Sequence, residues 1–124
     1  WLALGGAIGA AIGRAVGDAT GYDLSRTVAQ IRPGYGFDVT CQGSVPEALI
    51  CALEAESYED AVRLAVSLGG DADTQACIAG AIAEARFGVP ASIAETALAY
   101  LDDDLRSVAI RFRDNYGMRM GGCL

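Results

Sequence analysis

The sequence contains no histidine and no lysine, and these two absences exclude several kinds of catalytic and metal site. Without histidine there is no Ser-His or Cys-His nucleophile pair, no imidazole general base and no imidazole-ligated zinc. Without lysine there is no Schiff base and no P-loop lysine. The chemistry that remains depends on carboxylate, hydroxyl, thiol and guanidinium groups.

Positive charge and aromatic residues are also scarce. The 9 basic residues stand against 16 Asp and Glu residues, which gives a formal net charge of −7. Nucleic acid and anionic membrane surfaces both attract clustered positive charge, so we expect neither as a partner. Hydrophobic residues make up 52% of the chain but aromatics only 7%; alanine supplies a large share of the rest, and a further 16 residues are glycine. This composition favours closely packed helices with small side chains between them.

The four cysteines form no CxxC pair, so the spacing of a zinc site is absent. A chain of 124 residues does not need disulfides, and we expect free thiols in the reducing cytoplasm. Only Cys41 lies beside other candidate site residues. The apolar stretch over residues 2–12 is too short to span a bilayer, and Arg14 and Asp18 follow it at once. It also lacks the basic N-terminal region of a signal peptide, so we expect no membrane or targeting segment.

Capping residues and glycines predict a series of helices. Asp23 is expected to cap a helix over residues 24–31, and Ser57 one that stops at Gly69-Gly70. Between them, Ser44-Val45-Pro46-Glu47 reads as a capping box with proline in the first turn. Further helices are expected over residues 74–87, 91–101 and about 102–117.

No segment alternates with period two, so the sequence predicts an all-α fold, a compact orthogonal multi-helix bundle. We expect one domain over residues 1–124. The last helix is expected to bury Leu105, Val108, Ala109 and Phe112. Glycines recur every fourth residue over 1–21, at Gly5, Gly9, Gly13, Gly17 and Gly21. That spacing favours a tightly packed helix over a binding role.

The sharpest candidate site is the segment Gly69-Gly70-Asp71-Ala72-Asp73-Thr74. Two glycines permit a tight turn, after which two carboxylates and a hydroxyl converge at a helix start. Such hard oxygen donors suit Mg²⁺, Ca²⁺ or Mn²⁺. Taken alone, this spacing also fits an ordinary capped helix with acidic residues in its first turn. Three protein oxygens underfill a six-coordinate cation, so water, a ligand or another segment must supply the rest.

A second candidate is the glycine-containing loop from Tyr35 to Ser44. Tyr35 and Phe37 offer aromatic faces that can stack on a base. The free N–H groups expected at Ser44 can hold a phosphate. An ordered loop whose aromatics seal the core explains the same residues equally well. The run Asp102-Asp103-Asp104, by contrast, favours capping over metal binding because successive helical side chains point in different directions.

Two segments of the chain resemble the ADP-ribosylglycohydrolase family of the dinitrogenase-reductase-activating type. The first is residues 21–49, GYDLSRTVAQIRPGYGFDVTCQGSVPEAL, and the second is residues 58–90, which contain the pattern GGDADTxAxIxGAIAxAxxG. The resemblance implies an all-α enzyme with a two-metal Mg²⁺ or Mn²⁺ centre. Such enzymes hydrolyse the glycosidic bond between ADP-ribose and a protein side chain or small acceptor. By position, Asp71, Asp73 and Thr74 match metal ligands of the family, and Asp71 and Asp73 are the candidate catalytic residues.

The same resemblance assigns the loop residues by region. It implies that ADP-ribose contacts four of them: Tyr35, Phe37, Gly43 and Ser44. The general base is left unassigned, with Glu47 the nearest carboxylate by sequence. The implied partners are ADP-ribose or an ADP-ribosylated protein.

The sequence also departs from the family pattern. It has no Thr-Asp-Asp segment, which supplies the other metal ligands in the family. Residues 13–21 resemble the family's opening GxAxGDAxG helix. If this match is real, a large middle section is deleted between that helix and Tyr22; if it arises by chance, the chain is a C-terminal half of the family fold over residues 22–124. The alternatives are therefore a hydrolase, a hydrolase that needs a second copy or complementing chain, and a non-catalytic ADP-ribose-binding or oligomerising remnant.

Overall fold

The protein is represented by a computed structural model that describes residues 11 and 13–116. Within that range the chain forms helices joined by loops and contains no strand, which confirms the all-α prediction. No helix among these residues is long and apolar enough to cross a membrane. The chain divides into two compact units, residues 1–87 and 88–124. The expectation of a single domain stays a prediction.

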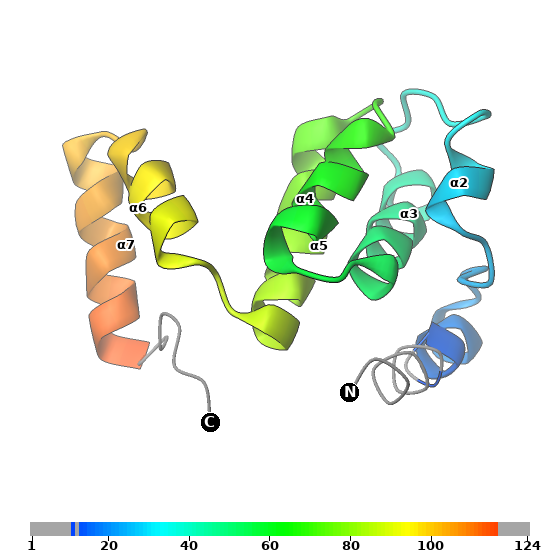
Figure 1. The fold of residues 1–124 in the computed structure, drawn as a ribbon, viewed down its shortest axis with the longest axis horizontal. Coiled ribbons are helices and arrows are strands. Elements are labelled where there is room, and N and C mark those ends of the chain that lie inside the picture. Colours follow the sequence, from blue (N-terminus) through cyan, green and yellow to red (C-terminus); the bar gives the residue numbers. More distant parts are fainter. Residues whose placement is uncertain (1–10, 12, 117–124) are drawn as a thin grey trace. The chain divides into compact units, whose positions relative to one another are not determined.

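The first unit is built on three helices that all contact one another: α3 (Cys41–Glu54), α4 (Tyr58–Ser67) and α5 (Ala72–Phe87) (Figure 1). The short α2 (Val28–Ile31) packs on α3, and residues 13–20 form a further helix. The fully buried alanines of this core are Ala48, Ala52, Ala61, Ala65, Ala79 and Ala83. Methyl-sized side chains let helices approach closely, as the composition predicted.

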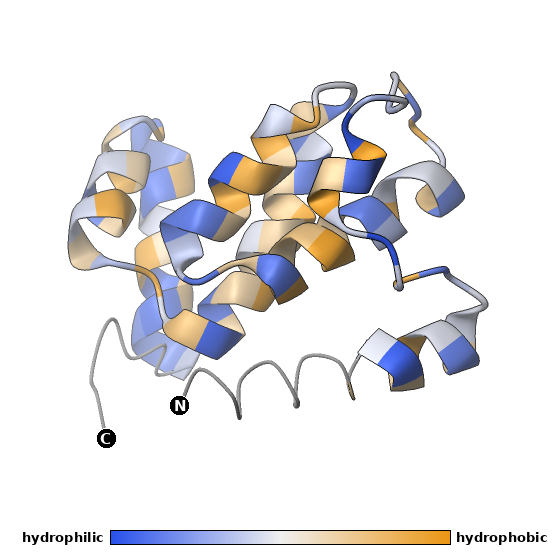
Figure 2. Ribbon diagram, turned by 45° about the vertical axis from the view of Figure 1, so that its right-hand side comes forward, coloured by the Kyte–Doolittle hydropathy of each residue, from blue (hydrophilic) through white to orange (hydrophobic). Residues whose placement is uncertain are grey.

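The second unit contains α6 (Ala91–Ala99) and α7 (Asp103–Tyr116), which contact each other. Neither helix has a buried residue. The prediction that the last helix buries its apolar face was wrong, because Leu105, Val108 and Phe112 are 55%, 52% and 51% exposed. Figure 2 shows hydrophobic and hydrophilic residues interspersed along the ribbons of the helices. Two helices alone cannot enclose an apolar stripe.

Two helix starts differ from the prediction. The helix expected over residues 24–31 is only α2, and Thr27 caps it instead of Asp23. Thr27 accepts a hydrogen bond from the Gln30 N–H while the Gln30 side chain accepts one from the Thr27 N–H, a complete capping box. Asp23 instead accepts hydrogen bonds from the N–H and hydroxyl of Ser25. The capping box therefore outcompetes the single cap.

Helix α3 begins three residues before the expected capping box at Ser44. Thr40 is the N-cap, and its side chain accepts a hydrogen bond from the Gly43 N–H. The Ser44 N–H already donates to the Thr40 carbonyl at 3.0 Å. The expectation of a free N–H group at Ser44 was therefore wrong. Pro46 lies inside the helix, where it costs the hydrogen bond its N–H would have made.

Other boundaries agree with the sequence. Ser57 caps α4 through the Asp60 N–H, and Gly88, with a φ of +72°, follows the end of α5. In the glycine stripe, a side chain on Gly13 would meet Leu53 of α3, and one on Gly17 would meet the Tyr22 carbonyl. Gly5 and Gly9 lie outside the described residues. Gly13 and Gly17 thus permit close contacts, whereas Gly21 lies after the helix with a φ of +77° and nothing within 4 Å.

Candidate functional site

The acidic turn between α4 and α5 depends on two glycines. Gly69 and Gly70 have φ values of +78° and +65°, a region that side chains other than glycine avoid. The chain reverses there, and α5 begins at Ala72. Asp71 and Asp73 therefore lie at the start of a 16-residue helix, as the sequence predicted. The helix dipole favours negative charge at this position.

The two carboxylates of this turn are neighbours. The pKa of the Asp73 carboxyl lies below its ordinary value, first because of hydrogen bonding with the Asp71 side chain, a bond that needs one proton shared between the two carboxyl groups. The backbone N–H groups of Thr74 and Asp73 lower the pKa further. Asp73 and Thr74 are exposed, and Asp71 is half-buried. The turn thus presents a pair of adjacent acidic oxygens and one hydroxyl to solvent.

The aromatic loop packs directly against this turn. A Cβ atom on Gly70 would lie 2.8 Å from both the Gly36 carbonyl oxygen and the Tyr35 Cε1 atom. Only a glycine permits this approach. The two segments that the sequence singled out separately are therefore neighbours in the first unit, and their contacting residues Gly36 and Gly70 are 34 positions apart in the chain.

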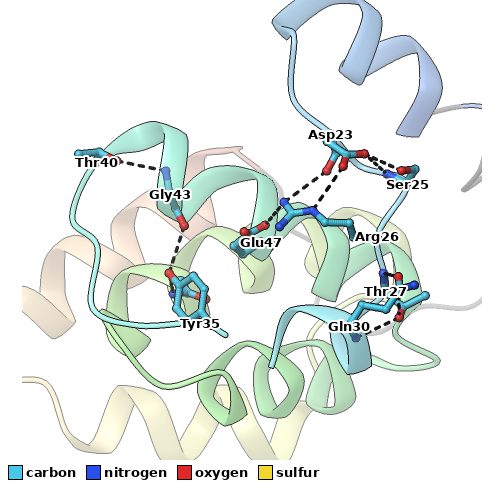
Figure 3. A network of polar contacts seen from close by, with 10 residues as sticks. Asp23, Ser25, Arg26, Thr27, Gln30, Tyr35, Thr40, Gly43 and Glu47 are labelled. Carbon is cyan, nitrogen blue, oxygen red and sulfur yellow. Dashed lines mark hydrogen bonds and ion pairs between the residues drawn. The ribbon is translucent and has the colours of Figure 1, made fainter. Parts of the chain in front are cut away.

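Tyr35 is the side chain that joins the two segments. Its hydroxyl donates a hydrogen bond to the Gly43 carbonyl at 3.1 Å and accepts one from Nε2 of Gln75 on α5 (Figure 3). Burial raises the pKa of the Tyr35 hydroxyl, and the charges of Glu47, Asp38 and Asp71 raise it further. The hydroxyl therefore stays protonated and acts as a structural donor and acceptor.

The other predicted loop residues have different environments. Phe37 is 75% exposed, so its ring is free to stack on a ligand. Ser44 is buried, and its hydroxyl donates to the Asp38 carbonyl at 2.9 Å. A side chain on Gly43 would collide with the Asp38 carboxylate, which explains a glycine inside α3. Of this group, Phe37 alone has most of its side chain accessible to a ligand.

Glu47, the nearest candidate base by sequence, is engaged elsewhere. It is buried at 6% exposure, and its Oε2 lies 2.9 Å from Nη2 of Arg26. Arg26 also reaches the Asp23 carboxylate at 3.6 Å (Figure 3). The Glu47 carboxylate thus ties the segment before α2 to α3, which argues against a role as a free base.

A half-open cleft of about 690 Å³ lies between the helix over residues 13–20, the following loop and α3. Arg14, Asp18, Arg26, Leu53 and Glu54 are among its lining residues. None of the seven residues predicted for the site lines it. The cleft and the acidic turn are therefore separate features of the first unit.

The acidic run near α7 has a capping role. Asp102 accepts a hydrogen bond from the Leu105 N–H, and Asp103 pairs with Arg106 at 3.5 Å. Over residues 11 and 13–116, no group of three or more Asp, Glu or Cys side chains could together hold a metal ion. The acidic turn is thus a two-carboxylate donor set.

Gln75 was not identified from the sequence. One signal could have found it: Gln75 is a polar residue four and eight positions before Ala79 and Ala83, and therefore lies on the same face of α5. All three residues are fully buried. Its partner lies 40 residues away in the chain, which no local pattern reveals.

Comparison with known proteins gives the following findings. The family model for ADP-ribosylglycohydrolase matches residues 25–120, which is most of the chain. No curated protein and no solved structure matches the chain.

Proposed function

The chain belongs to the ADP-ribosylglycohydrolase family, and from that premise we propose that it acts in metal-dependent hydrolysis of a glycosidic bond of ADP-ribose. The leaving group would be a protein side chain or a small acceptor. The observation that carries the proposal is the packing of the Tyr35–Phe37 loop on the turn that bears Asp71 and Asp73. A possible donor set and an exposed aromatic ring thus belong to two segments that are in contact.

Asp71, Asp73 and Thr74 would hold Mg²⁺ or Mn²⁺ with hard oxygen donors, which fit either ion in type. They fall short in number, so water, substrate or another chain must complete the coordination. When bound, such a cation would orient ribose hydroxyls and supply an activated water. This is the sense in which Asp71 and Asp73 are the candidate catalytic residues.

The loop would bind the nucleotide part of the substrate. Phe37 has the exposed ring needed to stack on adenine. Tyr35, Gly43 and Ser44 would act by shaping the loop, since their polar groups already bond within the chain. A second copy or a complementing chain remains the proposed source of further ligands.

The test is turnover of ADP-ribosyl-arginine with Mg²⁺ or Mn²⁺. The Asp71→Asn/Asp73→Asn variant is expected to lose turnover by at least about 100-fold, because it removes the charged donors. The matched control is Asp103→Asn/Asp104→Asn, which changes two aspartates at another helix start and should keep full turnover. Equal turnover in wild type and the Asp71/Asp73 variant would overturn the proposal.

The short donor set over the described residues favours a second candidate, a module that binds ADP-ribose without hydrolysing it. Calorimetry with ADP-ribose, with and without Mg²⁺, separates the two functions. Binding without turnover supports the module, and no heat in either titration excludes it. Light scattering on the same samples reports whether a second copy is bound.

A further inference from the structure

Gln75 is a polar side chain on a buried helix face whose other fully buried positions are alanine or glycine. It is fully buried and shares the buried face of α5 with Ala79 and Ala83. It lies one helical turn after Asp71, whose carbonyl accepts the Gln75 N–H at 3.1 Å. Burying an amide costs free energy unless both of its polar atoms find partners.

Only one of those atoms has a partner. Nε2 donates to the Tyr35 hydroxyl, whereas Oε1 is buried with no hydrogen-bond partner. Reversing the amide would move the unpartnered atom from Oε1 to Nε2 without removing it, because the Tyr35 hydroxyl is the one hydrogen-bond partner of the Gln75 side chain among the described residues. A single hydrogen bond set against an unpartnered buried polar atom adds little net stability, so core stability alone does not explain this glutamine.

We infer that Gln75 is a positioning residue, which acts through the Tyr35 hydroxyl to hold the aromatic loop on the acidic turn. The chain of contacts runs from Gln75 to Tyr35 and on to Gly43, and the Tyr35 ring edge rests where Gly70 has no side chain. Phe37, two residues along, belongs to the same loop, so the contacts of Tyr35 limit how far Phe37 can move from the acidic turn. That the loop binds ADP-ribose rests on the proposed function, whereas the role of Gln75 in placing the loop does not.

The first test is Gln75→Met, which keeps the side-chain length and removes both the donor and the unpartnered oxygen. Thermal unfolding should occur at the wild-type temperature or above it, because the uncompensated buried carbonyl is gone. The loop should nevertheless open more often, so chymotrypsin should cut after Phe37 about fivefold faster than in wild type. This factor corresponds to the free energy of one lost hydrogen bond, which raises the population of the open loop.

The second unit supplies an internal control for this digestion. Tyr100 is 86% exposed, and cleavage there should keep its wild-type rate, as read from fragment masses. Cleavage after Phe37 at the wild-type rate would overturn the inference. So would a large drop in melting temperature, because Gln75 would then be a structural residue.

The second test combines Gln75→Met with Tyr35→Phe. Tyr35→Phe alone strands the Gln75 amide in the core and should lower the melting temperature. Adding Gln75→Met should restore the melting temperature but leave cleavage after Phe37 as fast as in either single variant. A purely structural role predicts that both quantities recover together, and that outcome would contradict positioning.

The third readout is calorimetric binding of ADP-ribose in the presence of Mg²⁺. Gln75→Met should weaken binding by up to about tenfold, the loss that corresponds to one misplaced contact. If wild type binds and Gln75→Met binds equally well, positioning fails while the proposed function stands. If wild type does not bind, the proposed function fails, and digestion at Phe37 still decides whether Gln75 positions the loop.

Discussion

The two units of the chain differ in what their helices enclose. In the first, α3, α4 and α5 all contact one another and surround fully buried alanines, together with Gln75. In the second, α6 and α7 contact each other, yet neither has a buried residue. Three mutually packed helices create an interior, whereas a pair of helices creates only an interface.

This difference explains where the candidate site lies. Every predicted site residue is in the first unit. There the aromatic loop is held by hydrogen bonds from Gln75 to Tyr35 and from Tyr35 to Gly43, and the first of these comes from a side chain buried between helices. The aspartates that begin α7 have no comparable support, and Asp103 is fully exposed. An acidic pair becomes a candidate site only where the surrounding chain holds it in place.

The largest contrast between the units is expected for overpacking. Ala65→Leu places a larger side chain at a fully buried position, and we expect a loss of about 3 kcal/mol in the free energy of unfolding. The matched change Ala97→Leu, at an exposed position of α6, should cost less than about 0.5 kcal/mol. Urea unfolding measures both. Similar losses would show that the second unit is packed as tightly as the first.

The next contrast compares two glycines of positive φ. Gly70→Ala adds backbone strain and a collision with Tyr35 and Gly36, for a loss of roughly 2–3 kcal/mol. Gly88→Ala adds the strain alone, because nothing lies within 4 Å, and should cost about 1 kcal/mol. Equal losses in thermal unfolding would mean that the loop does not press on the turn.

A smaller contrast concerns ion pairs. Arg26→Met leaves the buried Glu47 carboxylate without its partner, and we expect a loss of roughly 1–2 kcal/mol because Arg26 itself is partly exposed. Asp103→Asn removes an exposed pair of the second unit and should leave the melting temperature unchanged. A gain in stability in the Arg26→Met variant would contradict the role of this ion pair in connecting the segment before α2 to α3.

The last comparison concerns alkaline pH. Burial first, then the charges of Glu54 and Glu47, raise the pKa of the Cys51 thiol from 9.0 to about 12. Because the folded pKa lies above the unfolded value, this stability is fully present below pH 9 and is lost as the pH rises towards 12. Urea unfolding of Cys51→Ala should show a shallower loss over that range than wild type, whereas the exposed Cys77→Ala should match wild type.

Local signals in the sequence predicted much of the fold. The cap at Ser57, the positive-φ stop at Gly88 and the glycine turn before α5 depend on short-range chemistry, and all are present. Where two capping residues competed, the sequence was ambiguous: Thr40 caps α3 although Ser44 begins a plausible capping box. The exposed face of α7 shows that an amphipathic pattern does not reveal whether a partner is present.

The candidate site was predictable as two segments but not as one surface. The glycines and carboxylates of the turn, and the aromatics of the loop, each suggested a site from residue type and spacing. Their contact depends on Gln75, whose partner lies 40 positions away, and on the missing side chain of Gly70. Contacts of that kind are decided by tertiary packing, which no local window contains.

The alanine core also limits how this chain can diverge. Where a methyl group is the only thing between two helices, a larger residue separates them and glycine loosens them. Variation at the six fully buried alanines should therefore be confined to residues close to alanine in size, such as serine and cysteine. In a library that randomises all six at once, folded members should be rare, and drift should accumulate instead at the loops and on the outer faces of α6 and α7.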